Sequence, residues 1–187
     1  MKQYEVTMAG FGGQGVMVAG QLLAYAGIKE GKNVVWLPSY GPEMRGGTAY
    51  CTVVISDVRI GSPIINNPSS CCVFNRPSFD KFAPRVKPGG LLIVNSSLIS
   101  VSSDRADITQ ILIPANQMAL EGGSVKSTNV AILGCFLAAT NLVEHKTMLK
   151  TLEDKLGAKR ALLETNMKVF EAGYQFGLAA LAQRSHA

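Results

Sequence analysis

The sequence from Glu5 to Leu37, EVTMAGFGGQGVMVAGQLLAYAGIKEGKNVVWL, decides the fold. Its first five residues, Glu5–Ala9, are a mostly apolar run that predicts a buried strand. The glycines of Gly10–Gly15 follow directly, and the apolar residues from Val16 onward predict a helix that ends near Gly31. The stretch therefore predicts a strand that turns sharply into a helix.

A second strand is predicted at the end of the same stretch. Val34–Leu37 is a continuous apolar run, and we expect a buried strand that Pro38 ends. The order of strand, glycine turn, helix and strand is typical of a parallel α/β sheet with a right-handed crossover.

The rest of the chain extends this pattern and then becomes helical. Further strands are predicted at Ala49–Ile55, Cys71–Phe74, Leu91–Val94 and Ile108–Ile113, a short helix at Ser78–Val86, and longer helices at Val130–Leu142, Lys146–Leu156 and Arg160–Leu181. The last of these helices carries one apolar face, which favours packing on the sheet over binding a partner. We expect one domain over residues 1–187, with an α/β fold: a three-layer, mostly parallel Rossmann-like sheet, helices on both faces and a helical C-terminal third.

Composition excludes several classes of protein. Of the 187 residues, 47% are hydrophobic and 17% are charged, which excludes a disordered chain or a coiled coil and indicates that part of the surface meets another protein. The net charge is only +5 and the basic residues are scattered, so we expect no nucleic-acid partner. The sequence has no signal-peptide core and no apolar stretch of about 18 residues, so we expect a cytoplasmic protein with no membrane partner.

The four cysteines predict no metal site. Cys51, Cys71, Cys72 and Cys135 include no C-x-x-C pair, and Cys71 and Cys72 should point to opposite faces of a strand. Zinc sites and iron–sulfur clusters need three or four ligands in one small volume. We therefore expect reduced, half-buried thiols, and no metal or cluster held by this chain.

The glycine motif is a candidate binding site. After a strand and before a helix, glycines expose N–H groups at the positive end of the helix dipole, which suits a phosphate. NAD and ATP are disfavoured, because no acid ends the second strand and no Walker lysine is present. The alternative that these glycines only allow the strand and the helix to pack closely, with no ligand, stays open. The candidate residues of this motif are Gly12, Gly13, Gln14 and Gly15.

A second candidate lies between two predicted strands, at Ser39–Gly47. This loop should lie at the carboxyl edge of the sheet, where ligands of open α/β sheets bind. Arg45 offers donors that suit a carboxylate or phosphate, although a Glu43–Arg45 surface pair is the open alternative. The candidate ligand- or interface-binding residues here are Tyr40, Pro42, Glu43, Arg45, Gly46 and Gly47.

Three more polar residues are candidates at the same edge. Lys126 and Asn129 precede an apolar helix, where Lys126 could meet an anionic ligand, although Thr128 or Asn129 could simply cap that helix. Asn95 follows a predicted strand, as a site residue or a plain turn residue. No residue is predicted to be catalytic, because the sequence has no nucleophile elbow and its two histidines lie in polar surroundings.

The paired motifs resemble one family. Gly-Phe-Gly-Gly-Gln-Gly at 10–15 and Ser-Tyr-Gly-Pro-Glu-Met-Arg-Gly-Gly at 39–47 resemble, in sequence and order, the gamma subunits of 2-oxoacid:ferredoxin oxidoreductases. Ile60–Pro63, Pro88–Gly90 and Asn129–Gly134 also fit that pattern, so the resemblance covers nearly the whole chain.

The resemblance implies a complex that oxidatively decarboxylates a 2-oxoacid, transfers the acyl group to coenzyme A and reduces ferredoxin. It implies alpha, beta and delta subunits as partners, with thiamine diphosphate and Mg²⁺ on alpha and beta, and [4Fe-4S] clusters on beta and delta. This chain would carry no cluster and would complete or stabilise the active site. Arg45 and the N–H groups of Gly12 and Gly13 would orient an anionic group, first a phosphate of coenzyme A and second the carboxylate of the substrate.

The resemblance favours 2-oxoglutarate or a branched-chain 2-oxoacid over pyruvate as substrate. Three alternatives stay open: a purely structural subunit, an indolepyruvate oxidoreductase beta-type chain, and a free-standing nucleotide-binding protein.

Overall fold

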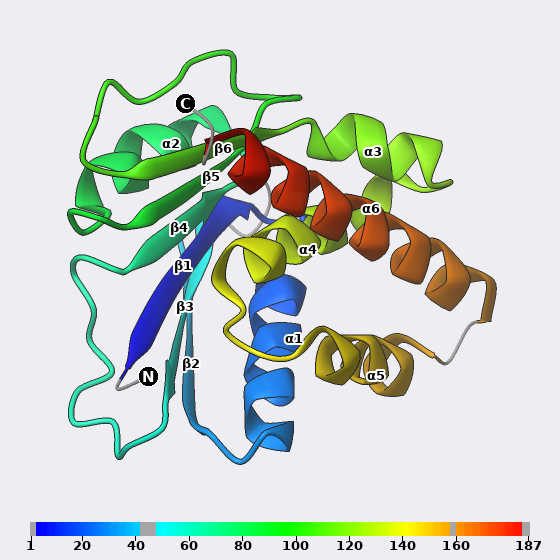
Figure 1. Cartoon of the computed structure of the whole chain (residues 1–187), viewed down its shortest axis with the longest axis horizontal. Helices are drawn as coiled ribbons and strands as arrows, with labels where there is room; N and C mark the ends of the chain where they lie inside the picture. The colour runs from blue at the N-terminus through cyan, green and yellow to red at the C-terminus, as the bar shows by residue number, and fades with distance from the viewer. Residues whose placement is uncertain (1–2, 42–47, 158–159, 185–187) are drawn as a thin grey trace.

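A computed structural model describes residues 3–41, 48–157 and 160–184 of the chain. These residues form one six-stranded sheet with helices packed on it (Figure 1). The strands are β1 (Tyr4–Phe11), β2 (Asn33–Tyr40), β3 (Thr48–Ser56), β4 (Ser70–Val73), β5 (Leu91–Asn95) and β6 (Thr109–Ile113). The helices are α1 (Val16–Lys29), α2 (Arg76–Phe82), α3 (Ala115–Glu121), α4 (Thr128–Thr140), α5 (His145–Leu156) and α6 (Arg160–Arg184), with short 3₁₀ turns η1 (Ala83–Arg85) and η2 (Val125–Ser127).

The sheet is mostly parallel, as predicted. Its strand order is β2-β3-β1-β4-β5-β6, and β1, β4, β5 and β6 are parallel neighbours. β3 is antiparallel to both β1 and β2, so β2 runs in the same direction as β1 without touching it. The predicted crossover from the first strand to the second therefore spans one intervening strand, because β2 and β3 form a hairpin and β3 takes the place beside β1.

The prediction that Pro38 ends a buried strand is wrong. β2 continues through Pro38 to Tyr40, and its residues are half-buried or exposed. β2 is an edge strand, so the missing N–H of Pro38 removes no bond from the interior of the sheet. Its apolar run reflects one face packed on α1, not burial on both faces.

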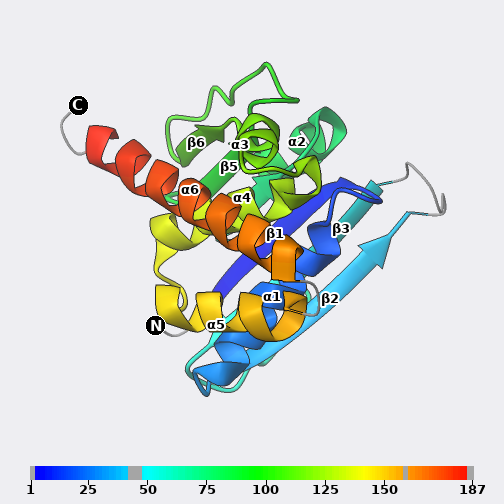
Figure 2. The same ribbon diagram turned by 90° about the vertical axis from the view of Figure 1, so that its right-hand side faces the viewer.

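Helices cover both faces of the sheet, but unevenly. α1, α4 and α6 lie over one face, which Figure 2 shows from the helical side, and most of the buried apolar residues gather there. α2 and η1 cover the other face with a smaller apolar cluster. Cys71 belongs to the smaller cluster and Cys72 to the larger, which confirms that they point to opposite faces. All four thiols are fully buried rather than half-buried. Cys51, Cys71 and Cys72 lie on strands whose two faces are both covered, and Cys135 lies in the buried helix α4.

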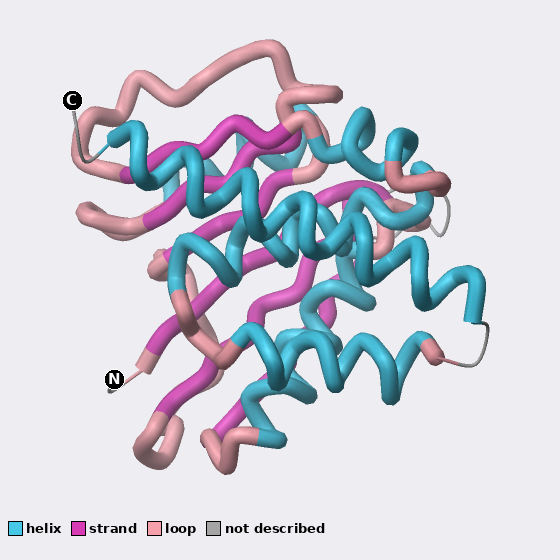
Figure 3. Tube along the Cα trace, turned by 45° about the vertical axis from the view of Figure 1, so that its right-hand side comes forward, coloured by secondary structure: helices cyan, strands magenta, loops and turns pink. Residues whose placement is uncertain are grey.

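The C-terminal third is helical, as predicted, but α6 packs mainly on α4 and contacts the sheet at the edge strand β6. α4 is apolar on every side and is buried between the sheet and α6, as Figures 1 and 3 show. The two helices approach closely at Gly134 and Gly173, where a Cβ would meet the backbone of the facing helix.

Two short elements, α3 and η2, were not predicted; they follow β6 at the carboxyl edge and bring Asn116 and Lys126 toward the glycine turn. Within the parts of the chain that the structure describes, no helix is long and apolar enough to cross a membrane.

Candidate functional site

The glycine turn joins the end of β1 to the start of α1. Gly13 and Gly15 have positive φ angles of 96° and 75°, which L side chains rarely adopt. A Cβ on Gly12 or Gly13 would meet no atom of the described residues within 4 Å, so the backbone of these two residues faces open space in the described part of the chain. Gly15 begins α1 with no side-chain cap, and the first turn of α1 contains no acidic residue. The turn therefore leaves helix N–H groups without a side-chain acceptor, a favourable place for an anion.

Gln14 folds back over this turn and is held there from two sides. Its Oε1 accepts hydrogen bonds from the backbone N–H of Phe11 at 2.7 Å and from Nδ2 of Asn75 at 3.0 Å. Asn75 follows β4 and caps α2, because its Oδ1 accepts from the backbone N–H of Ser78 at 3.0 Å. The turn, the end of β4 and the start of α2 are thus joined through two amides.

Asn129 holds the same turn from the far side. It is 4% exposed at the start of α4, and its Nδ2 donates to the carbonyl oxygen of Gly15 at 3.0 Å. The open alternative that Thr128 or Asn129 caps the helix is wrong, because α4 has no side-chain cap and the hydroxyl of Thr128 instead donates to the carbonyl of Val125. Asn129 therefore lies beneath the turn, where it supports the backbone.

Asn95 is also buried beneath the edge. It is the last residue of β5, not a plain turn residue, and it is 0% exposed. Its Nδ2 donates to the carbonyl of Phe74 at 3.2 Å and to Oδ1 of Asn116 at 2.8 Å. Among the residues that the structure describes, its Oδ1 has no hydrogen-bond partner. Asn95 is thus linked to the pocket surface by its hydrogen bond to Asn116.

Asn75 and Asn116 were not predicted as site residues. Asn75 stands directly after a predicted strand, as Asn95 does, and the carboxyl ends of parallel strands share one edge of the sheet. That signal was available in the sequence for Asn75. Asn116 lies in the unpredicted helix α3, and no local pattern marked it.

Two depressions flank the glycine turn, and Gly13 lines both. The apolar pocket, about 390 Å³, is lined by Phe11, Gly12, Gly13, Gly15, Val16, Met17, Val18, Tyr40 and Ala49. The amide pocket, about 200 Å³, is lined by Gly13, Gln14, Asn116, Val125, Lys126 and Thr128. Lys126 is exposed at the rim of the amide pocket, and among the described residues no acidic side chain lines either depression.

The β2–β3 hairpin reaches the same edge. Phe11 pairs with Thr48, and Tyr40 pairs with Ala49, so both strand ends lie beside the glycine turn. Tyr40 is 69% exposed there. The other predicted residues of this motif, Pro42, Glu43, Arg45, Gly46 and Gly47, lie outside the described residues.

The chemistry of these side chains does not fit a metal centre. Burial raises the pKa of Cys51, Cys71 and Cys135 to about 12, and it also raises the pKa of Cys72, so the thiols stay protonated. Across residues 3–41, 48–157 and 160–184, no three acidic, histidine or cysteine side chains are grouped to hold a metal ion. The described part of the edge offers hydrogen-bond donors instead, with no carboxylate lining either depression.

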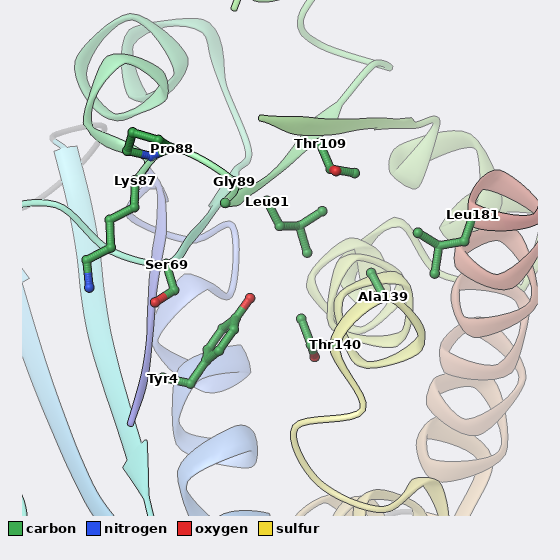
Figure 4. A pocket seen from close by; sticks show the side chains of 11 residues that line it. Tyr4, Ser69, Lys87, Pro88, Gly89, Leu91, Thr109, Ala139, Thr140 and Leu181 are labelled. Atoms are coloured by element: carbon green, nitrogen blue, oxygen red, sulfur yellow. The ribbon is translucent and has the colours of Figure 1, made fainter. Parts of the chain in front are cut away.

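A third cavity, of about 400 Å³, lies at the opposite edge of the sheet (Figure 4). The starts of the parallel strands form one wall, with Tyr4 and Leu91, and Leu181 of α6 lies across from them (Figure 4). Burial raises the pKa of Tyr4, and the amino group of Lys87 is bound to Glu5 at 2.8 Å. None of the predicted site residues that the structure describes lines this cavity.

Residues 5–176 match the protein-family model described as pyruvate ferredoxin/flavodoxin oxidoreductase. The ketoisovalerate oxidoreductase subunit VorA of Methanothermobacter marburgensis is 36% identical over 173 residues, which are 92% of this chain and 36% of that protein. The chain thus spans about a third of the length of this relative. The 2-oxoglutarate synthase subunit KorC of Methanocaldococcus jannaschii is 33% identical over 174 residues, 91% of this chain and 92% of KorC.

The fold also matches a solved structure. The 2-oxoglutarate:ferredoxin oxidoreductase of Magnetococcus marinus, solved with 2-oxoglutarate, coenzyme A and succinyl-CoA bound, superposes with a TM-score of 0.88 at 25% identity. The match covers 96% of this chain and 32% of that one.

Proposed function

The chain belongs to the pyruvate ferredoxin/flavodoxin oxidoreductase family, and we propose that it acts as the gamma subunit of a 2-oxoacid:ferredoxin oxidoreductase. In this proposal residues 1–187 are one gamma-type domain. The complete enzyme oxidatively decarboxylates a 2-oxoacid, transfers the acyl group to coenzyme A and reduces ferredoxin in the cytoplasm. The names of the ketoisovalerate and 2-oxoglutarate relatives support a branched-chain 2-oxoacid or 2-oxoglutarate as substrate in preference to pyruvate.

The observation that carries this proposal is the open glycine turn. The backbone of Gly12 and Gly13 faces open space at the carboxyl edge, beside the exposed end of β2, and no carboxylate of the described residues lines the two depressions there. We assign to these N–H groups, together with Arg45, the orientation of an anionic group. A phosphate of coenzyme A is the first choice, supported by the coenzyme A in the M. marinus structure, and the carboxylate of the 2-oxoacid is the second.

The reactive cofactors belong to other subunits in this proposal. Alpha, beta and delta subunits would hold thiamine diphosphate with Mg²⁺ and the [4Fe-4S] clusters, which supply carbanion chemistry and electron transfer. The buried, protonated thiols of this chain do not fit a cluster. This chain orients a reactant. Holding a reactant in the productive geometry can lower the activation free energy by several kcal/mol without proton transfer by this chain.

The test uses the assembled complex. Arg45→Ala should raise the KM for coenzyme A or for the 2-oxoacid while the complex still assembles, because one charged donor to the anion is lost. Unchanged kinetics in a normally assembled complex would contradict the site.

A purely structural subunit is the second candidate. The large exposed apolar side chains of Val18 and Tyr40 beside the turn favour it, because such residues cluster where partners bind. It predicts that Arg45→Ala weakens co-purification with the partner chains and changes no kinetic constant in the complexes that form.

A further inference from the structure

The amide pocket contains two side-chain amides whose oxygens are already engaged. Oε1 of Gln14 accepts from Phe11 and Asn75, which occupies both of its lone pairs. Oδ1 of Asn116 accepts from Nδ2 of Asn95 at 2.8 Å. Among the described residues, the amide hydrogens of Gln14 and Asn116 have no acceptor, and both side chains line the pocket. The two amides therefore present donors to it.

The orientation of these amides is fixed from below by groups that cannot exchange roles. Asn75 must point its oxygen at the N–H of Ser78 to cap α2, so its Nδ2 faces Gln14. Asn95 must point its Nδ2 at the carbonyl of Phe74, so the same Nδ2 reaches Asn116. A flipped Asn75 or Asn95 would place two acceptors, or two donors, against each other. The backbone thus sets the direction of all four amides.

This arrangement leaves one buried side-chain oxygen without a hydrogen-bond partner among the described residues. Oδ1 of Asn95 is buried and has no partner among the described residues, although a buried polar atom normally finds one. The orientation that leaves this oxygen without a partner is the one that directs Nδ2 of Asn95 to the carbonyl of Phe74 and to Asn116. The fold retains the orientation that keeps the amide hydrogens of Asn116 outward.

We propose that the amide pocket is a subsite for an anionic oxygen group, and that Asn75 and Asn95 are positioning residues that keep its amides facing it as donors. Lys126, at the rim with no ion-pair partner in the described part of the chain, adds the positive charge. The inference rests on the proposed function, in which this edge meets an anionic ligand. It adds the side-chain amides of Gln14 and Asn116 and the amino group of Lys126 to the groups assigned to that ligand, next to the backbone of Gly13.

The chain offers substitutions that change the donors and spare the fold. Gln14→Glu keeps an acceptor for Phe11 and Asn75, and Asn116→Asp keeps one for Asn95, but each replaces an outward N–H₂ with a charged oxygen. Asn75→Ser keeps a good cap for α2 and removes only the donor that holds Gln14. Gln117→Glu is the matched control, because it adds the same charge one residue from Asn116 and does not line the pocket.

The assembled complex provides the main measurement. Gln14→Glu and Asn116→Asp should each raise the KM for coenzyme A by about tenfold or more with little change in kcat, since a charge-assisted bond is replaced by repulsion. Asn75→Ser should raise the KM for coenzyme A by roughly three- to tenfold, because the amide of Gln14 loses the donor that fixes its orientation. Gln117→Glu should leave it unchanged. An increase in the KM for the 2-oxoacid instead identifies the substrate carboxylate, and not a phosphate, as the anion.

Two results would overturn the proposal. The first is that Gln14→Glu and Asn116→Asp change neither the KM for coenzyme A nor the KM for the 2-oxoacid in the assembled complex. If Arg45→Ala changes one of these KM values in the same experiment, the subsite is refuted while the proposed function stands. The second result concerns the isolated chain. If the chain does not assemble with partners, the proposed function is refuted, and the subsite is tested by titrating inorganic pyrophosphate into the full chain and recording NMR spectra.

The subsite is overturned if the side-chain amide resonances of Gln14 and Asn116 do not shift. A shift that Gln14→Glu abolishes supports it.

Discussion

The side-chain amide of Asn129 donates a hydrogen bond to the carbonyl oxygen of Gly15, 114 residues away in the sequence. The bond ties the start of α4 to the residue from which α1 begins. A Cβ on Gly15 would overlap the Asn129 amide, so the two residues are closely fitted. The geometry of the glycine turn thus depends on a helix from the C-terminal third.

Asn129→Asp tests this dependence. The substitution replaces a buried donor with an oxygen that faces the Gly15 carbonyl, and we expect the free energy of unfolding to fall by about 1–3 kcal/mol. In the assembled complex the KM for coenzyme A should rise, because the turn loses its support. Chemical denaturation and steady-state kinetics measure the two effects. Asn66→Asp, in an exposed loop, is the matched control, and equal stability of the two variants would show that the Gly15 contact contributes nothing.

The crossing of α4 and α6 should not tolerate a larger residue at Gly173. A Cβ at this position would overlap the backbone carbonyl of Ala131, which belongs to the facing helix and cannot turn aside. Gly173→Ala should destabilise the chain by about 2 kcal/mol or more, although alanine is the better helix former. Thermal unfolding measures the change. Gly61→Ala, where a Cβ meets nothing within 4 Å, should be nearly neutral; a Gly173→Ala variant as stable as the wild type would refute the close crossing.

The four cysteines should resist thiol reagents in the native chain. All four are 0% exposed, and burial raises the pKa of Cys51, Cys71 and Cys135 to about 12. At pH 8 these thiols are therefore protonated as well as shielded, and only the thiolate attacks a disulfide reagent. We expect no labelling of the folded chain and four labels per chain in denaturant. Rapid labelling under native conditions would mean that a strand or α4 opens easily.

Glu5 should contribute to stability above acidic pH. Burial disfavours its charge, but bonds from Lys87 (2.8 Å), Ser69 (2.6 Å) and Gln3 (2.8 Å) together lower the pKa of Glu5 below its ordinary 4.5. A carboxyl whose pKa is lowered by folding stabilises the folded state above the unfolded pKa, and this contribution is lost as the pH falls through the folded pKa.

Glu5→Gln should accordingly lower the free energy of unfolding at pH 7 by about 1–3 kcal/mol. The difference from the wild type should shrink as the pH falls below 4.5. Urea denaturation at a series of pH values measures both. Glu121→Gln, at an exposed position on α3, should change stability little at any of these pH values. A difference that does not depend on pH would mean that the ionised form of Glu5 is not favoured by folding.

Local sequence predicted the elements well because their signals are local. The apolar run before Gly10 and the glycines after it fix β1, the turn and α1 within a few residues. The β-branched and apolar runs likewise predicted β3, β4, β5 and β6, and the apolar periodicity predicted α6. These patterns report which side chains can be buried on a strand or a helix, and neighbouring residues decide that.

The tertiary structure alone decided how these elements meet. The insertion of β3 between β1 and β2 made Pro38 an edge residue, and strand order depends on pairings between distant segments. Only the fold brings Asn75, Asn95 and Asn116 to one edge and turns their amides, because the acceptors that orient them belong to other elements. The sequence by itself determined that a glycine turn would join β1 to α1. Which side chains support that turn from beneath, and which reach its surface, follows from hydrogen bonds between residues far apart in the chain.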